Sequence, residues 1–251
     1  MEKINVTAVS YLNTRPFLYG LEHSSIRHQI NLFKEIPAGV AESLLSGNAD
    51  IGLVPVAVIP ALSDAHIISD FGIAAYGEVA SVCIYAAVPI EQVTTLLLDY
   101  QSRTSVELAK ILIRNYWKTN PEFKSSVAGY ESSIKDNTAG LIIGDRALQL
   151  KKEFKFCYDL GLAWKNYAGL PFIFACWVAN KPLKEEFIHA FNAALSFGME
   201  HIPEVATQNK DYYPGIDVYD YLKNKVQFRL TDEMKNAMTL FMQESKGLSL
   251  V

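Results

Sequence analysis

The chain has 251 residues, of which 50% are hydrophobic and 20% are charged, the composition of a soluble globular protein with one large domain or two smaller ones. Its net charge of -4 and the lack of a basic block argue against nucleic acid as a partner, because neutralising phosphates requires clustered lysine and arginine. No run of about 18 apolar residues is present, so neither a membrane span nor a membrane partner is expected.

Cysteine and histidine usage points to a reducing compartment and to a protein without a metal. The 3 cysteines are an odd number without CxxC spacing, so we expect free thiols. The first ten residues contain an acid at position 2 and no apolar core of signal-peptide length, so we expect a cytoplasmic protein. The 5 histidines are scattered without ligand spacing, and we expect neither a metal nor a cofactor.

The first part of the chain alternates strand and helix patterns. Pro37 suits the first turn of a helix, and Gly47 suits its end. Pro55 interrupts an apolar run that is otherwise typical of a buried strand. The predicted elements are strands over 4–9, 30–36 and 49–60, and helices over 17–21 and 37–47.

The middle continues this alternation, and the pattern after Lys181 predicts helices only. The clearest helix covers residues 102–118, with one narrow polar stripe on an otherwise apolar surface. Thr231 suits the N-cap of the last helix, and Gly247 suits its end. The predicted elements are strands over 80–89, 94–100, 125–131, 139–145, 156–161 and 170–180, and helices over 102–118, 145–154, 183–200 and 232–247.

Two long apolar strands, 80–88 and 170–179, are the natural places for the chain to cross between two lobes. They bracket a middle of about ninety residues, a plausible domain size. Strand-helix alternation indicates an α/β fold with mostly parallel sheets. We therefore predict a two-lobed α/β protein, with residues 1–86 and 176–251 in one lobe and 87–175 in the other.

Three loops that join a strand to a helix carry polar side chains. They are Ser10–Phe17, Asp99–Ser105 and Gly144–Arg146. In parallel α/β sheets ligands gather at the carboxyl ends of strands, and the free N–H groups of a helix start attract anions. The loops offer hydroxyls, backbone amides and arginine, without a recognisable nucleophile–base pair. This set describes a site for a small anion better than that of a hydrolase.

Each loop also has an interpretation that involves no ligand. Ser102 or Thr104 suits an N-cap, which stabilises a helix by about 1 kcal/mol. Asp145 suits the same role for the next helix, and Arg15 suits a salt bridge at the surface or between lobes. Ser81, at the start of a predicted crossing strand, suits an ordinary strand hydroxyl. Both interpretations of each loop stay open at this level.

Six stretches follow one another in order from about residue 4 to residue 180: VSYLNTRPF, ADIGLVPV, ASVCIYA, LDYQSRTSVELAKILI, LIIGDRAL and YDLGLAWKNYAGLPFIFACWVA. Together they resemble the chorismate dehydratase family of the futalosine route to menaquinone. The resemblance implies a periplasmic-binding-protein-like type II fold, in which two α/β lobes joined by crossing strands close on a ligand. It also implies a lyase that converts chorismate to 3-[(1-carboxyvinyl)oxy]benzoate and water.

The implied substrate carries two carboxylates, so its site needs two anion pockets. The loop with Asn13 and Arg15 is expected to supply one, and the helix start at residues 102–105 the other. We hypothesise that a substrate carboxylate takes the proton while Asn13 and Ser81 orient it, with Asp145 as an alternative acid–base group. The expected substrate contacts are Ser10, Tyr11, Arg15, Ser102, Arg103, Thr104, Ser105 and Gly144.

Two residues depart from the family pattern, and two other functions stay open. Family members often carry Glu and Thr where this chain has Ala163 and Ala168, and the second change removes a hydroxyl from the expected contact region. The alternatives are the sister enzyme 1,4-dihydroxy-6-naphthoate synthase and a non-catalytic binding protein for a small aromatic or carboxylate anion. The sequence makes no prediction of the oligomeric state.

Overall fold

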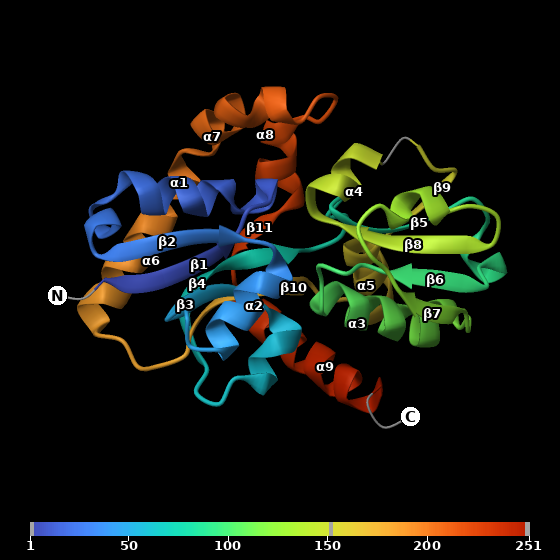
Figure 1. The fold of residues 1–251 in the computed structure, drawn as a ribbon, viewed down its shortest axis with the longest axis horizontal. Helices are drawn as coiled ribbons and strands as arrows, with labels where there is room; N and C mark the ends of the chain where they lie inside the picture. Colours follow the sequence, from blue (N-terminus) through green and yellow to red (C-terminus); the bar gives the residue numbers. More distant parts are fainter. Residues whose placement is uncertain (1–2, 151–152, 249–251) are drawn as a thin grey trace. The chain divides into compact units, whose positions relative to one another are not determined.

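The computed structural model describes residues 3–150 and 153–248, which divide into two units (Figure 1). Unit 1 comprises Met1–Ala74 and Ile173–Thr231, and unit 2 comprises Ala75–Phe172 and Asp232–Val251. The boundaries predicted from the sequence lie elsewhere, at 86/87 and 175/176. The last helix also belongs to unit 2, although the C-terminal helices were predicted to belong to the first lobe.

Unit 1 contains a six-stranded mixed sheet with the strand order β11-β4-β10-β3-β1-β2. β1 runs parallel to both β2 and β3, whereas β10 runs antiparallel to β3 and β11 antiparallel to β4. The carboxyl ends of β1, β2 and β3 therefore lie at one edge. The strands are β1 Ile4–Val9, β2 Ile30–Glu35, β3 Ile51–Pro55, β4 His66–Ala75, β10 Phe172–Ala179 and β11 Gln227–Arg229.

The first helix of unit 1 is fixed by close packing. Gly20 and Gly198 let α1 and α6 approach so closely that a Cβ on either glycine would lie 2.0 Å or 1.9 Å from a carbonyl oxygen of the other helix. Phe17 of α1 is fully buried among the rings of Phe71, Trp177 and Phe228. The helices are α1 Arg15–His23, α2 Pro37–Leu45, α6 Glu185–Glu200, α7 Ile202–Asn209 and α8 Val218–Asp220.

Unit 2 contains a five-stranded mixed sheet with the strand order β7-β6-β8-β5-β9. β6 runs parallel to β7 and β8, whereas β5 runs antiparallel to β8 and β9. The carboxyl ends of β6, β8 and β9 and the start of β5 therefore meet at the same edge. The strands are β5 Val82–Ala86, β6 Thr95–Leu98, β7 Glu122–Ser125, β8 Thr138–Ile143 and β9 Phe156–Asp159.

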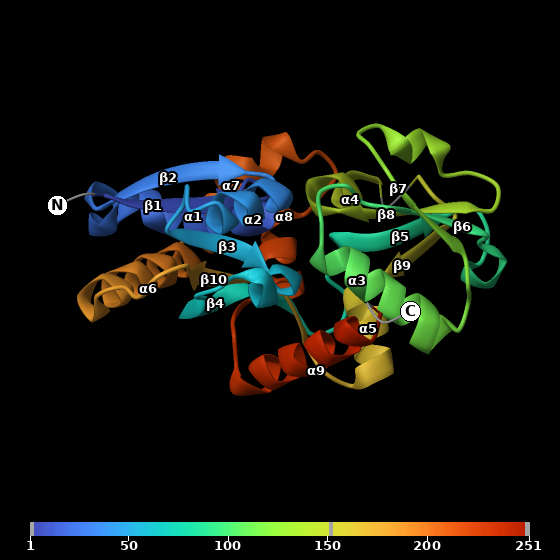
Figure 2. The same cartoon turned by 60° about the horizontal axis from the view of Figure 1, so that its bottom comes forward.

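Helices cover both faces of the unit 2 sheet. Figure 2 shows α3, α5 and α9 on one face and α4 on the other. Trp164 of α5, Phe172 and Phe241 of α9 form an aromatic core with ring centroids 5.0–6.4 Å apart. The helices are α3 Thr104–Ile111, which continues as a π-helix over Leu112–Trp117, α4 Gly144–Leu150, α5 Leu160–Ala168 and α9 Asp232–Leu248.

Single turns complete both units. The 3₁₀ segments are Leu12–Thr14, Ser25–His28, Val56–Ala61, Ile90–Gln92, Tyr130–Ser133 and Lys210–Tyr212, and a second π-helical turn covers Tyr221–Lys225.

The α/β class is confirmed, but the prediction of mostly parallel sheets is wrong. Antiparallel pairings include those of β10 with β3, of β11 with β4, and of β5 with both β8 and β9. All five residues of β5 are buried, so its sequence is a continuous apolar run like that of a strand in a parallel sheet. Strand direction is therefore not visible in the local pattern.

Several boundaries also differ from the sequence prediction. The predicted strand 125–131 is wrong except at its first residue, because β7 ends at Ser125 and a 3₁₀ turn begins at Tyr130. The prediction that only helices follow Lys181 is also wrong, because β11 at Gln227–Arg229 is a strand that pairs with β4. Gly247 does not end α9, which reaches Leu248. The predicted helix 145–154 includes residues 151–152, which lie outside the described residues.

Candidate functional site

One edge of the unit 2 sheet gathers two of the three polar loops singled out from the sequence, together with Ser81. Asp99 follows β6, Gly144 follows β8, and Ser81 immediately precedes β5. Because β5 runs antiparallel to β8, its start lies beside the end of β8. The backbone N–H of Gly144 donates to the carbonyl of Ser81 at 2.8 Å, so these two predicted site residues are neighbours. Asp145, half-buried, comes next in α4.

The start of α3 supplies the second group of predicted residues at this edge. The Ser102 hydroxyl oxygen accepts a hydrogen bond from the backbone N–H of Ser105 at 3.0 Å. Ser102 therefore satisfies a backbone N–H of the first turn of α3, as expected of a capping side chain, although Arg103 is the residue that directly precedes the helix. Thr104 and Ser105 are buried, at 2% and 4% exposure, whereas Arg103 is exposed.

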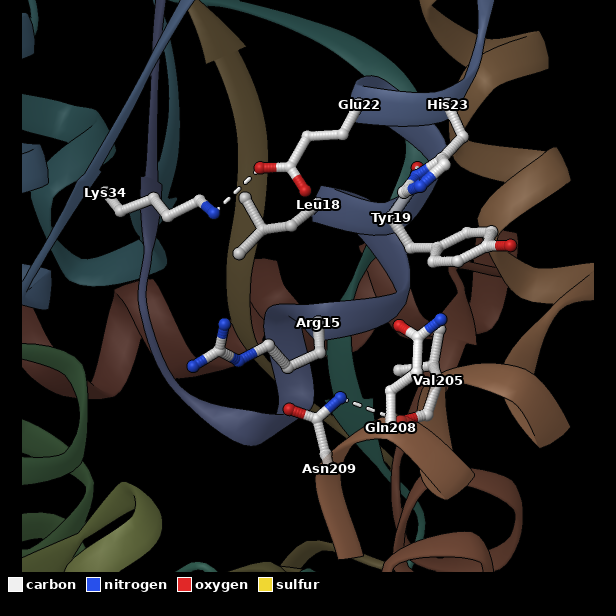
Figure 3. A pocket seen from close by; sticks show the side chains of 9 residues that line it. All are labelled: Arg15, Leu18, Tyr19, Glu22, His23, Lys34, Val205, Gln208 and Asn209. Carbon is white, nitrogen blue, oxygen red and sulfur yellow. Dashed lines mark hydrogen bonds and ion pairs between the residues drawn. The ribbon is translucent and has the colours of Figure 1, made fainter. Parts of the chain in front are cut away.

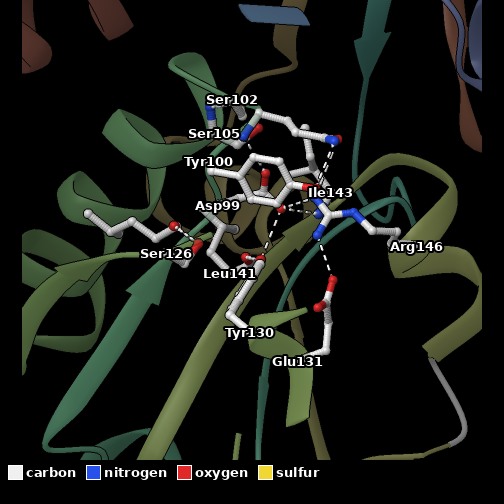
Figure 4. A network of polar contacts seen from close by, with 12 residues as sticks. Asp99, Tyr100, Ser102, Ser105, Ser126, Tyr130, Glu131, Leu141, Ile143 and Arg146 are labelled. Carbon is white, nitrogen blue, oxygen red and sulfur yellow. Dashed lines mark hydrogen bonds and ion pairs between the residues drawn. The ribbon is translucent and has the colours of Figure 1, made fainter. Parts of the chain in front are cut away.

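An ionic network centred on the buried carboxylate of Asp99 lies at this edge (Figure 4). Arg146 pairs with Asp99 at 2.6 Å through Nη2 and with Glu131 at 2.6 Å through Nη1. Asp99, only 3% exposed, also accepts from the Tyr130 hydroxyl at 2.9 Å and from the backbone N–H of Gln101 at 2.8 Å. The network therefore ties the loop after β6 to the first turn of α4.

Burial and pairing act in opposite directions on the charges of this network. Burial raises the pKa of Asp99, and Arg146 and the hydrogen bonds oppose that rise without cancelling it. Burial also raises the pKa of the Tyr130 hydroxyl, and the charge of Asp99 adds to the rise. The guanidinium of Arg146 lies over the ring of Tyr100, 5.1 Å from its centroid. Arg146 is thus held by carboxylates at its edge and an aromatic ring at its face.

Sequence reasoning assigned no role to Asp99, Tyr130 or Arg146. Asp99 and Arg146 were noticed only as members of two loops, and their pairing spans 47 residues of chain. A signal was present, because an acid that directly follows a buried apolar strand needs a cationic or hydrogen-bonding partner. The choice of Arg146 as that partner depends on the register of β6 and β8, which the sequence does not reveal.

The unit 1 candidates lie in the loop that follows β1. The backbone N–H of Ser10 donates to the carbonyl of Glu35 at the end of β2, which fixes where the loop begins. A 3₁₀ turn over Leu12–Thr14 follows, and the Thr14 hydroxyl donates to Oδ1 of Asn13 at 3.3 Å. Ser10, Tyr11, Asn13 and Arg15 are all half-buried.

Arg15 begins α1 and lines a pocket with residues of α1, β2 and α7 (Figure 3). Its Nε atom is buried without a hydrogen-bond partner. The neighbouring cation of that pocket, Lys34, pairs with Glu22 at 2.7 Å, whereas no ion pair to Arg15 occurs among the described residues. The guanidinium of Arg15 is therefore the uncompensated positive charge of this loop.

The two residues that depart from the family pattern both lie in α5. Ala163 is buried beside Trp164, and Ala168 is the last residue of the helix. Among residues 3–150 and 153–248, no group of three or more His, Cys, Asp or Glu side chains is arranged to hold a metal ion. Within the same residues, every helix is too short or too polar to cross a bilayer.

Comparison with known proteins identifies the family of the chain. A family model described as menaquinone biosynthesis matches residues 4–246. A chorismate dehydratase of Campylobacter jejuni is 26% identical over 254 residues, which cover 96% of this chain and 97% of that protein. A chorismate dehydratase of Thermus thermophilus is 27% identical over 222 residues, or 76% of this chain and 81% of its own. The resemblance inferred from the six sequence stretches is therefore confirmed.

Solved structures show the same fold at low sequence identity. A protein from Archaeoglobus fulgidus superposes with a TM-score of 0.77 at 13% identity, covering 99% of this chain and 98% of its own. The periplasmic aliphatic sulphonate binding protein SsuA of Escherichia coli gives a TM-score of 0.62 at 14% identity, with 100% and 94% covered. The periplasmic-binding-protein-like fold predicted from the sequence is confirmed.

Proposed function

Because the chain belongs to the menaquinone biosynthesis family, whose model matches residues 4–246, we propose that it is a chorismate dehydratase. The observation that carries the proposal is the Campylobacter jejuni relative, a chorismate dehydratase aligned over 96% of this chain and 97% of its own length. An alignment of that extent includes residues of both units.

The proposed reaction is the loss of water from a dicarboxylate. The ring of chorismate loses its hydroxyl and the proton of a neighbouring C–H, and the electron pair of that bond becomes part of an aromatic ring. The products are 3-[(1-carboxyvinyl)oxy]benzoate and one water, so the step needs neither an oxidant nor a reductant. Aromatisation supplies the driving force, and the enzyme has to lower the barrier to proton removal.

Both units carry donors that are suited to a substrate anion. Arg15 is suited to a carboxylate because it has a planar set of donors and no carboxylate partner among the described residues. The start of α3 is suited to an anion because it offers backbone N–H groups and buried hydroxyls. The proposed contacts are Ser10, Tyr11, Arg15, Ser102, Arg103, Thr104, Ser105 and Gly144.

Asn13 and Ser81 are the proposed catalytic residues, which orient a substrate carboxylate that takes the proton. The Thr14 hydroxyl occupies Oδ1 of Asn13, which leaves the amide NH₂ as the group available to donate. Ser81 is 1% exposed and is fixed through its carbonyl by Gly144. Asp145 stays the alternative acid–base group. Asn13→Ala should abolish turnover, and Asp145→Asn should preserve it, if the substrate carboxylate is the base.

Product analysis tests the proposed function. Purified protein is incubated with chorismate, and the mixture is followed by ultraviolet absorption and by liquid chromatography with mass spectrometry. We expect a benzoate with the mass of chorismate less one water. Asn31→Ala is a matched control for Asn13→Ala, since Asn31 is exposed and its side chain donates to Asn5 on the neighbouring strand. Binding of chorismate without any product would contradict the proposal and favour a receptor.

The cellular location of the protein stays a prediction. We propose the cytoplasm, because a lyase of this pathway acts on a soluble dicarboxylate without a membrane partner. Fractionation of cells that express the tagged chain tests it. Recovery with cytoplasmic marker enzymes is the expected result, and recovery from the periplasm or the membrane would contradict it.

A further inference from the structure

Ala80, the residue before Ser81, has an unusual backbone conformation. Its φ angle is +63°, in the left-handed region that residues with a Cβ rarely adopt. Such a conformation persists only where the surroundings impose it, and residues of this kind occur often at functional sites. Something in unit 2 must therefore hold Ala80 in place.

The carboxylate of Asp159, at the end of β9, is the group that holds it. Oδ2 accepts a hydrogen bond from the backbone N–H of Ala80 at 2.6 Å, and the two oxygens lie 3.1 and 3.2 Å from the backbone N of Val79. Oδ1 also accepts from the backbone N–H of Leu162 at 2.9 Å, which caps α5. One carboxylate thus satisfies three backbone donors from two segments that are about 80 residues apart in the chain.

These bonds make a proton-transfer role for Asp159 a poor explanation. Burial raises the pKa of Asp159, and the backbone N–H groups of Leu162, Ala80 and Val79 oppose the rise. Both oxygens already accept hydrogen bonds from backbone donors, which occupies acceptor sites that a general base would need. Its chemistry suits an anchor.

The anchor acts on Ser81 from one side while Gly144 acts from the other. Ala80 is held by Asp159, and the carbonyl of Ser81 accepts from the backbone N–H of Gly144. Val82 then enters β5, opposite Ile143 of β8. Asp159 thus fixes the peptide group between residues 79 and 80, and Gly144 fixes the one between residues 81 and 82. The backbone is held on both sides of Ser81, which sets the direction of its Cα–Cβ bond.

We propose that Asp159 is a positioning residue that sets where the Ser81 side chain leaves the backbone by holding Ala80 in its left-handed conformation. The inference rests on the dehydratase function proposed above. It adds a residue that does not touch the substrate and acts through the backbone of one that does.

The test begins with Asp159→Asn, which keeps the shape but has only one acceptor oxygen. That oxygen cannot hold both Ala80 and the start of α5. We expect kcat to fall on the order of tenfold or more, with KM changed by less than about threefold, because misplacement of a catalytic group affects the transition state more than binding.

A second substitution separates positioning from simple stability. Glycine adopts a positive φ without a steric penalty, so Ala80→Gly in the Asp159→Asn background should recover part of the lost kcat. Asp217→Asn is the matched control, because Asp217 caps α8 in unit 1 through the N–H of Asp220 as Asp159 caps α5. It should leave kcat unchanged. An unchanged kcat in Asp159→Asn, or a loss that Ala80→Gly does not reduce, would overturn the inference.

Hydrogen exchange provides a readout that is independent of activity. The N–H groups of Val79 and Ala80 should exchange faster in Asp159→Asn than in the wild type, and they should be unaffected by Asp217→Asn. If wild-type protein fails to convert chorismate, the proposed function fails, while exchange still decides whether Asp159 holds this segment. Unchanged exchange in Asp159→Asn would show that it does not.

Discussion

Replacing Arg146 with methionine removes the cation from the buried network of unit 2. Asp99, whose side chain is fully buried, would lose its ion pair at 2.6 Å and would be left with neutral donors only. Breaking a buried ion pair on one side costs about 3–5 kcal/mol. We expect the lower end of that range, because the Tyr130 hydroxyl and the backbone N–H of Gln101 still reach the carboxylate.

A loss of about 3 kcal/mol corresponds to a fall in Tm of about 6–12 °C for a chain of this size. Differential scanning calorimetry measures it, and Lys124→Met is the matched control. Lys124 pairs with Glu122 on the surface of the same unit, with side chains 51% and 65% exposed, so its loss should shift Tm by at most about 4 °C. Equal shifts for the two variants would refute the account of the network.

The same variant carries a pH signature. The pKa of Asp99 is higher in the folded state than in the unfolded state. This group therefore makes the protein less stable as the pH rises from the unfolded-state pKa through the folded-state pKa. Removing Arg146 raises that pKa further and enlarges the loss. The stability difference between wild type and Arg146→Met should therefore be larger at pH 8 than at pH 5. A difference that is larger at pH 5 would contradict the assignment.

Three further predictions concern the other loops and the packing of unit 1. Gly20→Ala places a Cβ 2.0 Å from a carbonyl of α6, so the variant should unfold at a clearly lower temperature, and an unchanged Tm would contradict the close packing. Ser102→Ala removes the cap on the N–H of Ser105 and should cost about 1 kcal/mol in urea unfolding, whereas Ser102→Thr should restore most of it. Arg15→Met should raise KM for chorismate at least about tenfold with a normal Tm, and Arg27→Met, which removes an exposed arginine of the same unit, should not.

Features encoded in neighbouring residues were predictable from the sequence. The strand over residues 4–9 and the helix that starts near Pro16 are specified by local alternation and by proline at the first turn. The capping role of Ser102 is also local, because its hydroxyl oxygen accepts a hydrogen bond from an N–H only three residues further along the chain. The α5 helix could have been found in the same way, since Asp159 caps its start and Gly169, at φ +71°, ends it.

Features that depend on strand pairing were not predictable. Asp159 reaches Ala80 only because β9 pairs with β5, and Asp99 reaches Arg146 only because β6 pairs with β8. The direction of β5 cannot be read from a strand that is buried on both faces. The sequence identified each polar loop of the unit 2 edge separately. The hydrogen bonds and ion pairs that hold these loops connect residues of different loops.

The most direct test of the proposed function is the product that the purified protein forms from chorismate. Liquid chromatography with mass spectrometry should detect 3-[(1-carboxyvinyl)oxy]benzoate, formed in step with the loss of chorismate, in the wild type and not in Asn13→Ala. Recovery of unchanged chorismate from wild-type protein with an intact fold would contradict the proposal that this chain is a dehydratase.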